Sequence, residues 1–342
     1  MSAALFGAAT PVSKVLLADI QVQVLAGLLY LGATVGVLPA AVRAKPMRLP
    51  WQAGRRTLIL LGGAILLGGI AGPLLLLLGL KNASAGSVSL WLNLEFVATV
   101  LLGHFVFRDY MTLRGWIAAA GTLVAAVLLV GAEGDPGLRA VMFVAGACLC
   151  WGFDNHLTAL IDGITPAQAT LWKGAVAGVF NLVIGGVLVG GIGSPGLVTS
   201  ALIVGALAYG LSVTLYISAA QGLGAIRSQM IFSTAPFFGF LMAVGILGES
   251  FTGLQILAAV IIIASLVILF REQHHHSHRH VAFAHRHDHA HDDAHHAHAH
   301  EAAPRGVTHS HWHEHEAAEH DHGHWPDLHH RHRHHEDGAD DK

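Results

Sequence analysis

Long apolar segments determine what this chain can fold into. Ten of them follow one another between residues 2 and 270, separated by short breaks that contain Gly, Pro or charged residues. A helix needs about 20 apolar residues to cross the roughly 30 Å hydrocarbon core of a bilayer, where backbone groups must be hydrogen-bonded. The sequence therefore predicts an all-α membrane protein with ten transmembrane helices. The expected spans are residues 2–18, 22–42, 57–79, 85–107, 113–131, 139–160, 166–190, 197–220, 226–247 and 252–270.

The charged residues divide the chain into two parts. Residues 1–271 carry 13 Lys and Arg against 8 Asp and Glu, whereas residues 272–342 carry 6 against 14. We expect the first part in the bilayer and the second in water. Neither part has the dense basic patch with interleaved aromatic residues that nucleic-acid binding requires, so no nucleic-acid partner is expected. We also find no motif of an enzyme active site, and predict that the protein is not an enzyme.

The basic residues of the loops predict the orientation. The longest internal loop, between the second and third spans, holds five Lys and Arg residues, and the positive-inside rule places it in the cytoplasm. With this loop inside, nine basic residues near the span ends lie inside and two outside. Both termini are then cytoplasmic. The first segment lacks the basic start and cleavage pattern of a secretory signal, so we expect it to be retained as the first span.

The chain also contains an internal repeat. The segment LNLEFVATVLLGHFVFRDYMTLRGWIAAA, which begins at Leu92, aligns with FSTAPFFGFLMAVGILGESFTGLQILAAV, which begins at Phe232. The segment LFGAATPVSKVLL near the N-terminus aligns more weakly with CWGFDNHLTALI, through Gly7 and Gly152. Five spans are thus repeated once. An odd number of spans in each repeat forces the two halves into opposite orientations, as in many secondary transporters.

In these segments the chain resembles the drug/metabolite transporter superfamily, and within it the EamA-type transporters with ten helices. The resemblance covers residues 3–270 and is carried by LFGAATPVSKVLL, LNLEFVATVLLGHFVFRD, CWGFDNHLTALI and STAPFFGFLMAVGILGE. It implies two EamA-type five-helix repeats, at residues 1–131 and 139–270, around a central cavity, with alternating access and transport of a small solute. Export is the expected direction. The C-terminal region, residues 271–342, is similar to that of a bacterial subgroup, which implies the cytoplasmic (inner) membrane of a bacterium.

Four charged residues lie inside the predicted spans, where each charge costs about 2.5 to 3.5 kcal/mol and normally faces a cavity or another charge. They are Lys14, Glu95, Asp154 and Lys173. Asp154 and Lys173 are equally distant from the centre of the turn DGIT between spans six and seven. Antiparallel helices that rise about 1.5 Å per residue bring such positions to the same depth, which predicts a buried ion pair. The pair either locks the hairpin or belongs to the transport site, and both roles stay open.

Glu95 is the strongest candidate for a residue of the transport site. It lies near the middle of span four, close to Asn93, and the sequence offers no obvious partner at its depth. A carboxylate buried there is readily protonated, so we predict that Glu95 lines the cavity or couples transport to protons. Lys14, toward the outer end of span one, either reaches Glu95 or extends outward.

Further polar, aromatic and Pro residues accompany these charges. Asn155 and His156 are expected to supply hydrogen bonds, and Trp151 to line the cavity or pack between helices. The alternative for His156 is a side chain that extends toward the cytoplasmic surface. Pro cannot donate a backbone hydrogen bond, so a Pro inside a span creates the broken helix around which midplane sites form. The Pro residues at such positions are Pro11, Pro73 and Pro236.

The C-terminal region is rich in His. It holds 25 of the 27 His residues and few large apolar residues, so it cannot bury a core and is predicted to be a disordered cytosolic tail. Alternating His-x-His places imidazoles on one side of an extended chain, where pairs can bind Zn²⁺, Ni²⁺, Co²⁺ or Cu²⁺. Binding should weaken below pH about 6.5, because the neutral imidazole is the ligand. The predicted ligands are His309, His311, His313, His315, His320, His322, His324, His329, His330, His332 and His334.

Three functions remain open at this point. The leading prediction is a secondary transporter of a small metabolite or drug-like solute, with the tail as a metal-binding regulator. One alternative is a transporter of divalent metal ions whose tail collects the ion, although the spans contain no cluster of metal ligands. The other is a metal sensor or buffer that the spans merely anchor. The expected partners are the lipid bilayer, a small solute and divalent metal ions on the tail. No cofactor is expected to be required, and a homodimer stays open.

Overall fold

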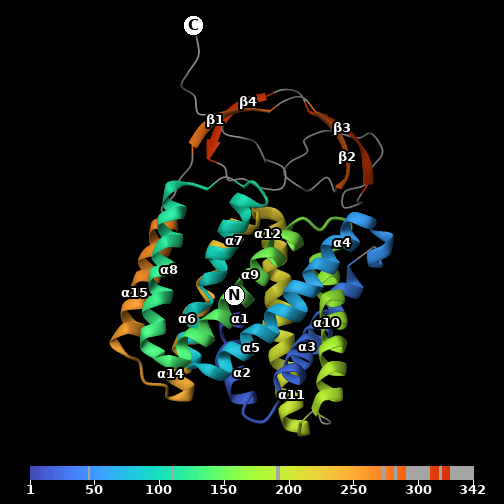
Figure 1. Cartoon of the computed structure of the whole chain (residues 1–342). Coiled ribbons are helices and arrows are strands. Elements are labelled where there is room, and N and C mark those ends of the chain that lie inside the picture. The colour runs from blue at the N-terminus through green and yellow to red at the C-terminus, as the bar shows by residue number, and fades with distance from the viewer. Residues whose placement is uncertain are drawn as a thin grey trace. The chain divides into compact units, whose positions relative to one another are not determined.

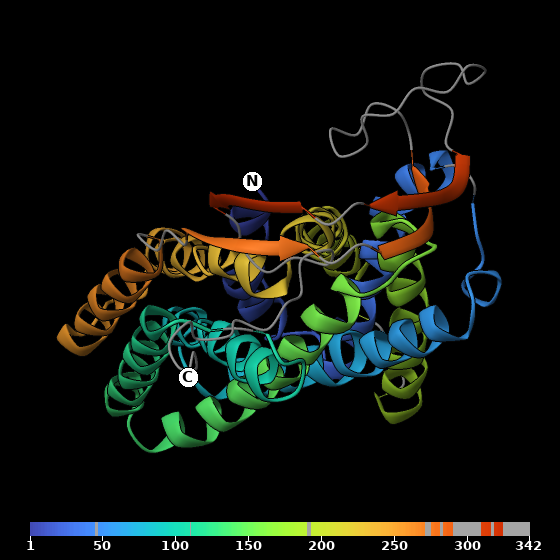
Figure 2. The same cartoon turned by 90° about the horizontal axis from the view of Figure 1, so that it is seen from above.

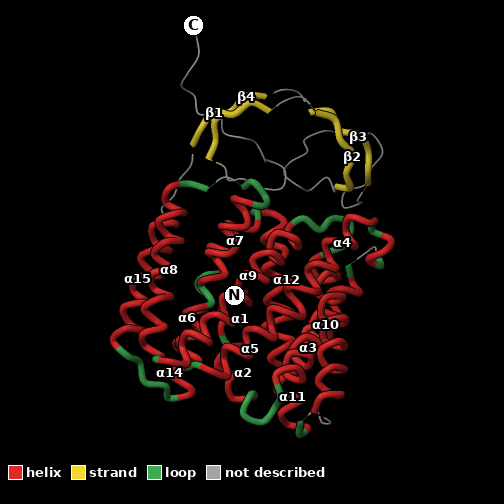
Figure 3. Tube along the Cα trace, in the orientation of Figure 1, coloured by secondary structure: helices red, strands yellow, loops and turns green. Residues whose placement is uncertain are grey.

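The computed structural model describes most of the membrane-spanning part of the chain. The described residues are 1–44, 47–109, 111–189 and 193–270, together with four strands beyond residue 274. They belong to two compact units, the first built from Met1–Glu272 with Trp325–Lys342 and the second from Gln273–His324. In its described residues the first unit is entirely helical, as predicted (Figure 3).

The helices of the first unit run side by side as a bundle (Figures 1 and 2). Short polar residues begin some of them. The Ser84 hydroxyl accepts from the amide of Ser87 at the start of α6, and the Thr112 hydroxyl accepts from the amide of Gly115 at the start of α8. The elements, in chain order, are α1 (Ser2–Gly7), α2 (Ala9–Leu16), α3 (Val22–Arg43), η1 (Pro50–Gln52), α4 (Arg55–Ala64), η2 (Ile65–Ala71), α5 (Gly72–Asn82), α6 (Ala85–Trp91), α7 (Leu94–Phe105), α8 (Leu113–Glu133), α9 (Asp135–Ala159), α10 (Pro166–Val189), α11 (Pro195–Val204), η3 (Gly205–Leu211), α12 (Ser212–Leu223), α13 (Ala225–Phe232), α14 (Ala235–Leu247) and α15 (Gly253–Phe270).

Nine helical stretches of the described chain are long and apolar enough to cross a membrane. They begin and end close to the second to tenth predicted spans. The first predicted span, over residues 2–18 with a break expected at Pro11, is divided in the structure: α1 ends at Gly7 and α2 begins at Ala9. Pro11 has no amide hydrogen to donate to the Gly7 carbonyl, so the hydrogen-bond ladder is interrupted there.

The outside of the bundle is strongly apolar. Large apolar side chains are exposed along the long helices, for example Val127 on α8 (71% exposed), Val187 on α10 (82%) and Leu241 on α14 (64%). Proteins that fold in water rarely expose large contiguous apolar patches, whereas the hydrocarbon core of a bilayer solvates them. The surface therefore agrees with a protein that spans the membrane several times.

The helices pack in pairs that relate the two halves of the chain. Helix α3 of span two packs along α10 of span seven, and α8 of span five packs along α15 of span ten. Helix α5 of span three packs on α9 of span six, and α12 of span eight packs on α1 of the first segment. Exchanging each of the first five segments with the segment five places later leaves this set of contacts unchanged. The pairs of spans two with seven and five with ten map onto themselves. The pair of spans three and six maps onto the pair of spans eight and one.

Irregular turns also recur at matching positions. The π-helical segment η2 covers Ile65–Ala71 and η3 covers Gly205–Leu211, so each residue of the first corresponds to the residue 140 positions later. Spans four and nine are interrupted too, the first by a turn after Trp91 and the second by a turn after Phe232. Pro236, in the first turn of α14, contributes to the second break because it donates no hydrogen bond. Such π segments and broken helices are frequent at functional sites.

The second unit contains four short strands. They are β1 (His275–His280), β2 (Phe283–His289), β3 (His309–His315) and β4 (Ala318–Gly323). Strand β1 pairs antiparallel with β4, and β2 with β3. The rest of residues 271–342 lies outside the described residues, so the predicted disorder of the tail stays a prediction. Alternation of His with other residues has the two-residue period of a β-strand, which makes extended pairing compatible with the sequence.

The strands bring His positions opposite one another. In the register of β2 and β3, three His positions of one strand pair with three of the other: His285 with His313, His287 with His311 and His289 with His309. Among the predicted metal ligands, those beyond the last strand lie outside the described residues. They are His324, His329, His330, His332 and His334.

Candidate functional site

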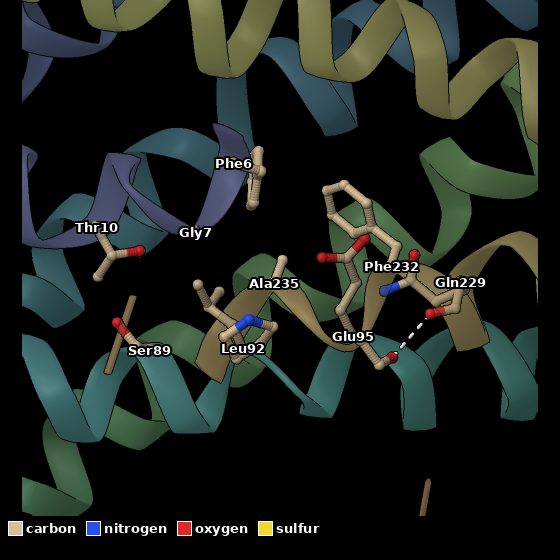
Figure 4. A pocket seen from close by; sticks show the side chains of 11 residues that line it. Phe6, Gly7, Thr10, Ser89, Leu92, Glu95, Gln229, Phe232 and Ala235 are labelled. Atoms are coloured by element: carbon tan, nitrogen blue, oxygen red, sulfur yellow. Dashed lines mark hydrogen bonds between the residues drawn. The ribbon is translucent and has the colours of Figure 1, made fainter. Parts of the chain in front are cut away.

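A pocket lies where the interrupted helices meet (Figure 4). It is enclosed by the turn between α1 and α2, the break between α6 and α7, and the break between α13 and α14. Of the residues that line it, Glu95 alone is charged. The lining consists of Phe6, Gly7, Thr10, Ser89, Leu92, Glu95, Gln229, Phe232, Ser233, Ala235 and Pro236.

Glu95 is held in a buried network of amides and hydroxyls. It lies in the first turn of α7, directly after the break. Nδ2 of Asn155, on α9, lies 2.9 Å from Oε1 of Glu95, 3.1 Å from Oγ1 of Thr99 and 3.2 Å from Oε1 of Gln229. The sequence offered no obvious partner for Glu95. The structure supplies one in Asn155, which was predicted to provide hydrogen bonds.

Aromatic rings gather beside this carboxylate. The ring centroids of Phe6 and Phe232 are 5.1 Å apart, and Tyr216 lies 5.0 Å from Phe232. The ring of Trp151 lies 6.0 Å from Phe6 in an edge-on arrangement. In Figure 4 the carboxylate of Glu95 points toward the rings of Phe6 and Phe232. The pocket thus combines one acidic group with an apolar aromatic wall.

The predicted ion pair between spans six and seven is confirmed. Nζ of Lys173, on α10, contacts Oδ2 of Asp154, on α9, and the two side chains are only 5% and 9% exposed. The Asp154 carboxylate occupies the space beside Gly68 of η2. The Gly68 carbonyl accepts hydrogen bonds from the Tyr30 hydroxyl and, at 3.1 Å, from Nε1 of Trp151. Trp151 therefore contacts both the π segment and the aromatic group near Glu95.

Pro73 explains why the carbonyls of Gly68 and Gly69 are free to accept hydrogen bonds from side chains. In a π-helix the amide of residue 73 would donate to the carbonyl of Gly68, and in an α-helix to that of Gly69. Pro73 has no amide hydrogen, so neither bond can form. The Gly69 carbonyl accepts from Nδ2 of Asn181 at 3.4 Å instead. The irregularity predicted at Pro73 is thus a π segment held by side chains of neighbouring helices.

We expect Gly68→Ala to disrupt this region, because a methyl group at residue 68 would overlap the Asp154 carboxylate. Overpacking of a buried contact costs about 1 to 3 kcal/mol, which should lower the thermal unfolding midpoint of the purified protein in detergent. Gly62→Ala is the matched control on the same span, since a methyl group at residue 62 would have no other group within 4 Å. Equal losses for the two variants would contradict the close approach.

Lys14 does not reach Glu95. Its Nζ donates to the carbonyl of Leu80 at 2.6 Å and to that of Ala83 at 2.8 Å, at the end of α5. Carbonyls at a helix C-terminus carry partial negative charge and favour a cation. Of the two orientations that the sequence left open for Lys14, the one away from Glu95 is therefore the one observed.

Two carboxylates hold the start of α6. Oε1 and Oε2 of Glu249 accept from the amides of Ala85 and Gly86, each at 2.9 Å. Oε2 of Glu133 accepts from the amide of Ser84 at 3.1 Å, and Oε1 accepts from its hydroxyl. These acceptors satisfy amides that a helix start leaves without intrahelical partners. They tie span four to the end of span five and to the loop after span nine.

Two other candidates have structural contacts. His156 is buried, with Nε2 2.9 Å from the carbonyl oxygen of Thr99 and its ring stacked 4.3 Å from Phe107. Of the two roles left open for His156, the hydrogen-bonding one is therefore observed, and the side chain does not extend to the surface. Asn93 donates to the Leu90 carbonyl at 3.1 Å, within the break of span four, and does not line the pocket.

The sequence did not single out several residues of the pocket. The polar ones are Thr10, Ser89, Gln229 and Ser233, and the aromatic ones are Phe6 and Phe232. The polar residues could have been found from the sequence, because polar side chains inside apolar spans often line a cavity. The repeat was a second signal, because Ser89 and Gln229 are 140 positions apart and so occupy equivalent places in the two halves.

The residues of the first unit do not provide an evident metal centre. Within the part of the chain that the structure describes, no three His, Cys, Asp or Glu side chains come together as ligands. The metal ligands predicted in the tail lie on the strands of the second unit or beyond them. Metal binding there stays a prediction.

Comparisons with known proteins agree with the helical bundle. The model of the EamA-like transporter family matches residues 1–131 and 138–271. An uncharacterized transporter from Methanothermobacter thermautotrophicus (strain Delta H) is 28% identical over 219 residues, which cover 60% of this chain and 62% of that protein, less than two thirds of its length. One solved crystal structure is similar with a TM-score of 0.59 and 15% identity, over 79% of this chain and 96% of that one, which shows the fold alone.

Proposed function

Because the chain belongs to the EamA-like transporter family, we propose that this multi-pass membrane protein transports a small metabolite or drug-like solute. The observation that carries the proposal is the pocket around Glu95, at which the interrupted first, fourth and ninth segments meet. Discontinuous helices of this kind form the midplane binding sites of secondary transporters, where they offer backbone groups and half-helix ends to the solute. The membrane concerned is the cytoplasmic membrane of a bacterium, and export is the proposed direction.

The proposed mechanism is alternating access between two inverted five-helix repeats, with α1 and α2 together as a short tenth span. Three observations support it: the repeated π segments, the repeated breaks, and packing contacts that map onto themselves when the halves are exchanged. At one end of the bundle, Glu249 and Glu133 tie the start of α6 to the residues after α14 and to the end of α8. We propose that this end faces the outside, because the loops at the opposite end carry the excess of basic residues.

A screen in reconstituted vesicles tests this function. Uptake and efflux of a solute panel that covers cations, anions and neutral molecules would be measured with the full chain and with protein-free vesicles. We expect saturable flux of at least one class of solute that depends on the protein. Failure of every class, with correctly inserted protein and in both directions, would contradict a transport function.

We propose that the His-rich tail responds to divalent metal ions in the cytosol and regulates transport. Support comes from its density of His and from the His pairs in the register of β2 and β3, since imidazole nitrogens are ligands for Zn²⁺ and Ni²⁺. Metal bound to the tail offsets part of its net charge of −8. This weakens its attraction to basic cytosolic loops, over distances limited to about 8 to 10 Å by screening.

Truncation after Gln273 is therefore expected to leave basal solute transport intact and to abolish its response to micromolar Zn²⁺ or Ni²⁺. The control is a full-length variant in which the tail His are replaced by Gln, which keeps the length of the tail and removes its ligands. An inactive truncated protein would favour a tail that delivers metal as the cargo. A full-length protein that ignores metal would leave no regulatory role, and metal-binding without any flux would favour an anchored sensor or buffer.

A further inference from the structure

The pocket also restricts the chemical class of the solute, an inference that rests on the proposed function. We propose that the solute is a protonated amine with a compact apolar body and no carboxylate. Its ammonium group would bind Glu95, and its body would lie against Phe6 and Phe232. The charges, the hydrogen-bonding groups and the wall of the pocket each point to this class.

The carboxylate of Glu95 has no basic partner in the described part of the chain. Lys173 contacts Asp154, and Lys14 donates to backbone carbonyls at the end of α5. The group that Glu95 does contact, the Asn155 amide, is neutral. A buried carboxylate is costly unless it is paired with a cation or protonated. A solute cation can supply the charge that the protein does not.

Several oxygens around the pocket can accept a hydrogen bond from a solute. The Asn155 amide carries two N–H hydrogens, yet three side-chain oxygens lie within 3.2 Å of its nitrogen. Oγ of Ser89, in the lining, is buried and has no hydrogen-bond partner, and the same holds for the Tyr216 hydroxyl nearby. An ammonium group is a donor only, with up to three N–H bonds to give. The carboxylate and hydroxyl oxygens of the site can therefore accept the N–H bonds of a protonated amine.

The walls of the pocket suit an organic cation. The rings of Phe6 and Phe232 lie next to the carboxylate, and Leu92 and Pro236 add apolar surface. Aromatic faces attract cations and also pack against apolar groups. By contrast, both Lys residues inside the spans are engaged elsewhere, so the lining offers no basic side chain to the carboxylate of an amino acid or organic acid.

The test compares four probes that share a phenylethyl frame on the purified full-length chain in detergent: phenethylamine, 2-phenylethanol, phenylalanine and the trimethylammonium analogue of phenethylamine. Isothermal titration calorimetry at pH 7 measures their dissociation constants. We expect phenethylamine to bind about 10- to 100-fold more tightly than the alcohol, the range that a hydrogen bond to a charged group provides. Phenylalanine should bind more weakly than phenethylamine, and so should the trimethylammonium analogue, which has no N–H to donate.

Glu95→Gln should abolish the preference for the amine, whereas Asp162→Asn, the same loss of charge in an exposed loop, should keep it. Because the probes are compared on the native chain, the test is decisive even if Glu95→Gln does not fold. Equal affinity for amine and alcohol, stronger binding of phenylalanine, or no binding of any probe at millimolar concentration would overturn the proposal. Flux measurements in vesicles distinguish a failure of the proposed transport function from a failure of the proposed solute class. An amine that binds but is not carried contradicts transport. Flux of anions that depends on Glu95 contradicts the amine class.

Discussion

Neutralising one member of the Asp154–Lys173 pair is expected to damage the protein more than neutralising both. In the single variants Asp154→Asn and Lys173→Met, the remaining charge stays buried without its partner, which typically costs about 3 to 5 kcal/mol. The double variant leaves no uncompensated charge at this contact, so it should recover part of the loss. The unfolding midpoint of each purified variant in detergent measures the effect. Losses that simply add up would show that the two side chains do not interact.

The same variants decide between the two roles left open for the pair. If the pair only locks the hairpin of α9 and α10, the double variant should regain transport together with stability. If the pair takes part in transport, the double variant should regain stability but stay slow. The Asp154 carboxylate lies beside Gly68 in the π segment η2. We therefore expect the second result, because this segment lies at the interface of spans three, six and seven, where a conformational change would act.

The second large effect is expected at Glu95. Glu95→Gln keeps the size of the side chain and an oxygen that can accept from Asn155 Nδ2, so the protein should insert and fold. It loses the negative charge, and with it the group that can bind a cation or release a proton. We expect initial transport rates in vesicles to fall at least about tenfold, the effect of losing one hydrogen bond to a charged group.

The pH dependence of transport is the second readout for Glu95. If this carboxylate couples transport to protons, the dependence on pH should be lost or altered in Glu95→Gln and kept in the control Asp162→Asn. A variant with normal rates and a normal pH profile would remove Glu95 from the mechanism. A variant that is slow but keeps the native pH profile would place coupling at another group and leave Glu95 as a binding residue.

The sequence predicted the spans because hydropathy identifies runs of apolar residues that are long enough to cross a bilayer. Among the described residues, nine of the ten predicted spans correspond to such helices. The sequence also predicted the contact between Asp154 and Lys173, because equal distance from a tight turn fixes equal depth in an antiparallel hairpin. It placed a helix break at Pro11 in the first segment, but it could not show that the interruption lies between Gly7 and Ala9. Hydropathy does not register a missing hydrogen bond, and a Pro at residue 11 is compatible with either a kink or a break.

The composition of the pocket was harder to predict, because it depends on which faces of distant helices meet. Gln229 comes from the second half of the chain, yet its amide oxygen lies 3.2 Å from the same Asn155 nitrogen that contacts Glu95. Only the packing of the broken spans brings them together. The partners of Lys14 could not be predicted from the sequence either. Its long side chain could reach several groups from one backbone position, and the choice of the Leu80 and Ala83 carbonyls follows from the neighbouring helix end.

Counterflow in reconstituted vesicles tests most directly whether this chain is a carrier that works through the Glu95 pocket. Vesicles are loaded with a high concentration of the unlabelled solute found in the flux screen, and uptake of a trace of labelled solute is followed with time. We predict a transient accumulation above equilibrium for the native chain and for the chain truncated after Gln273, but not for Glu95→Gln. Labelled solute that only equilibrates in native vesicles, without an overshoot, or an overshoot that Glu95→Gln retains in full, would contradict the account.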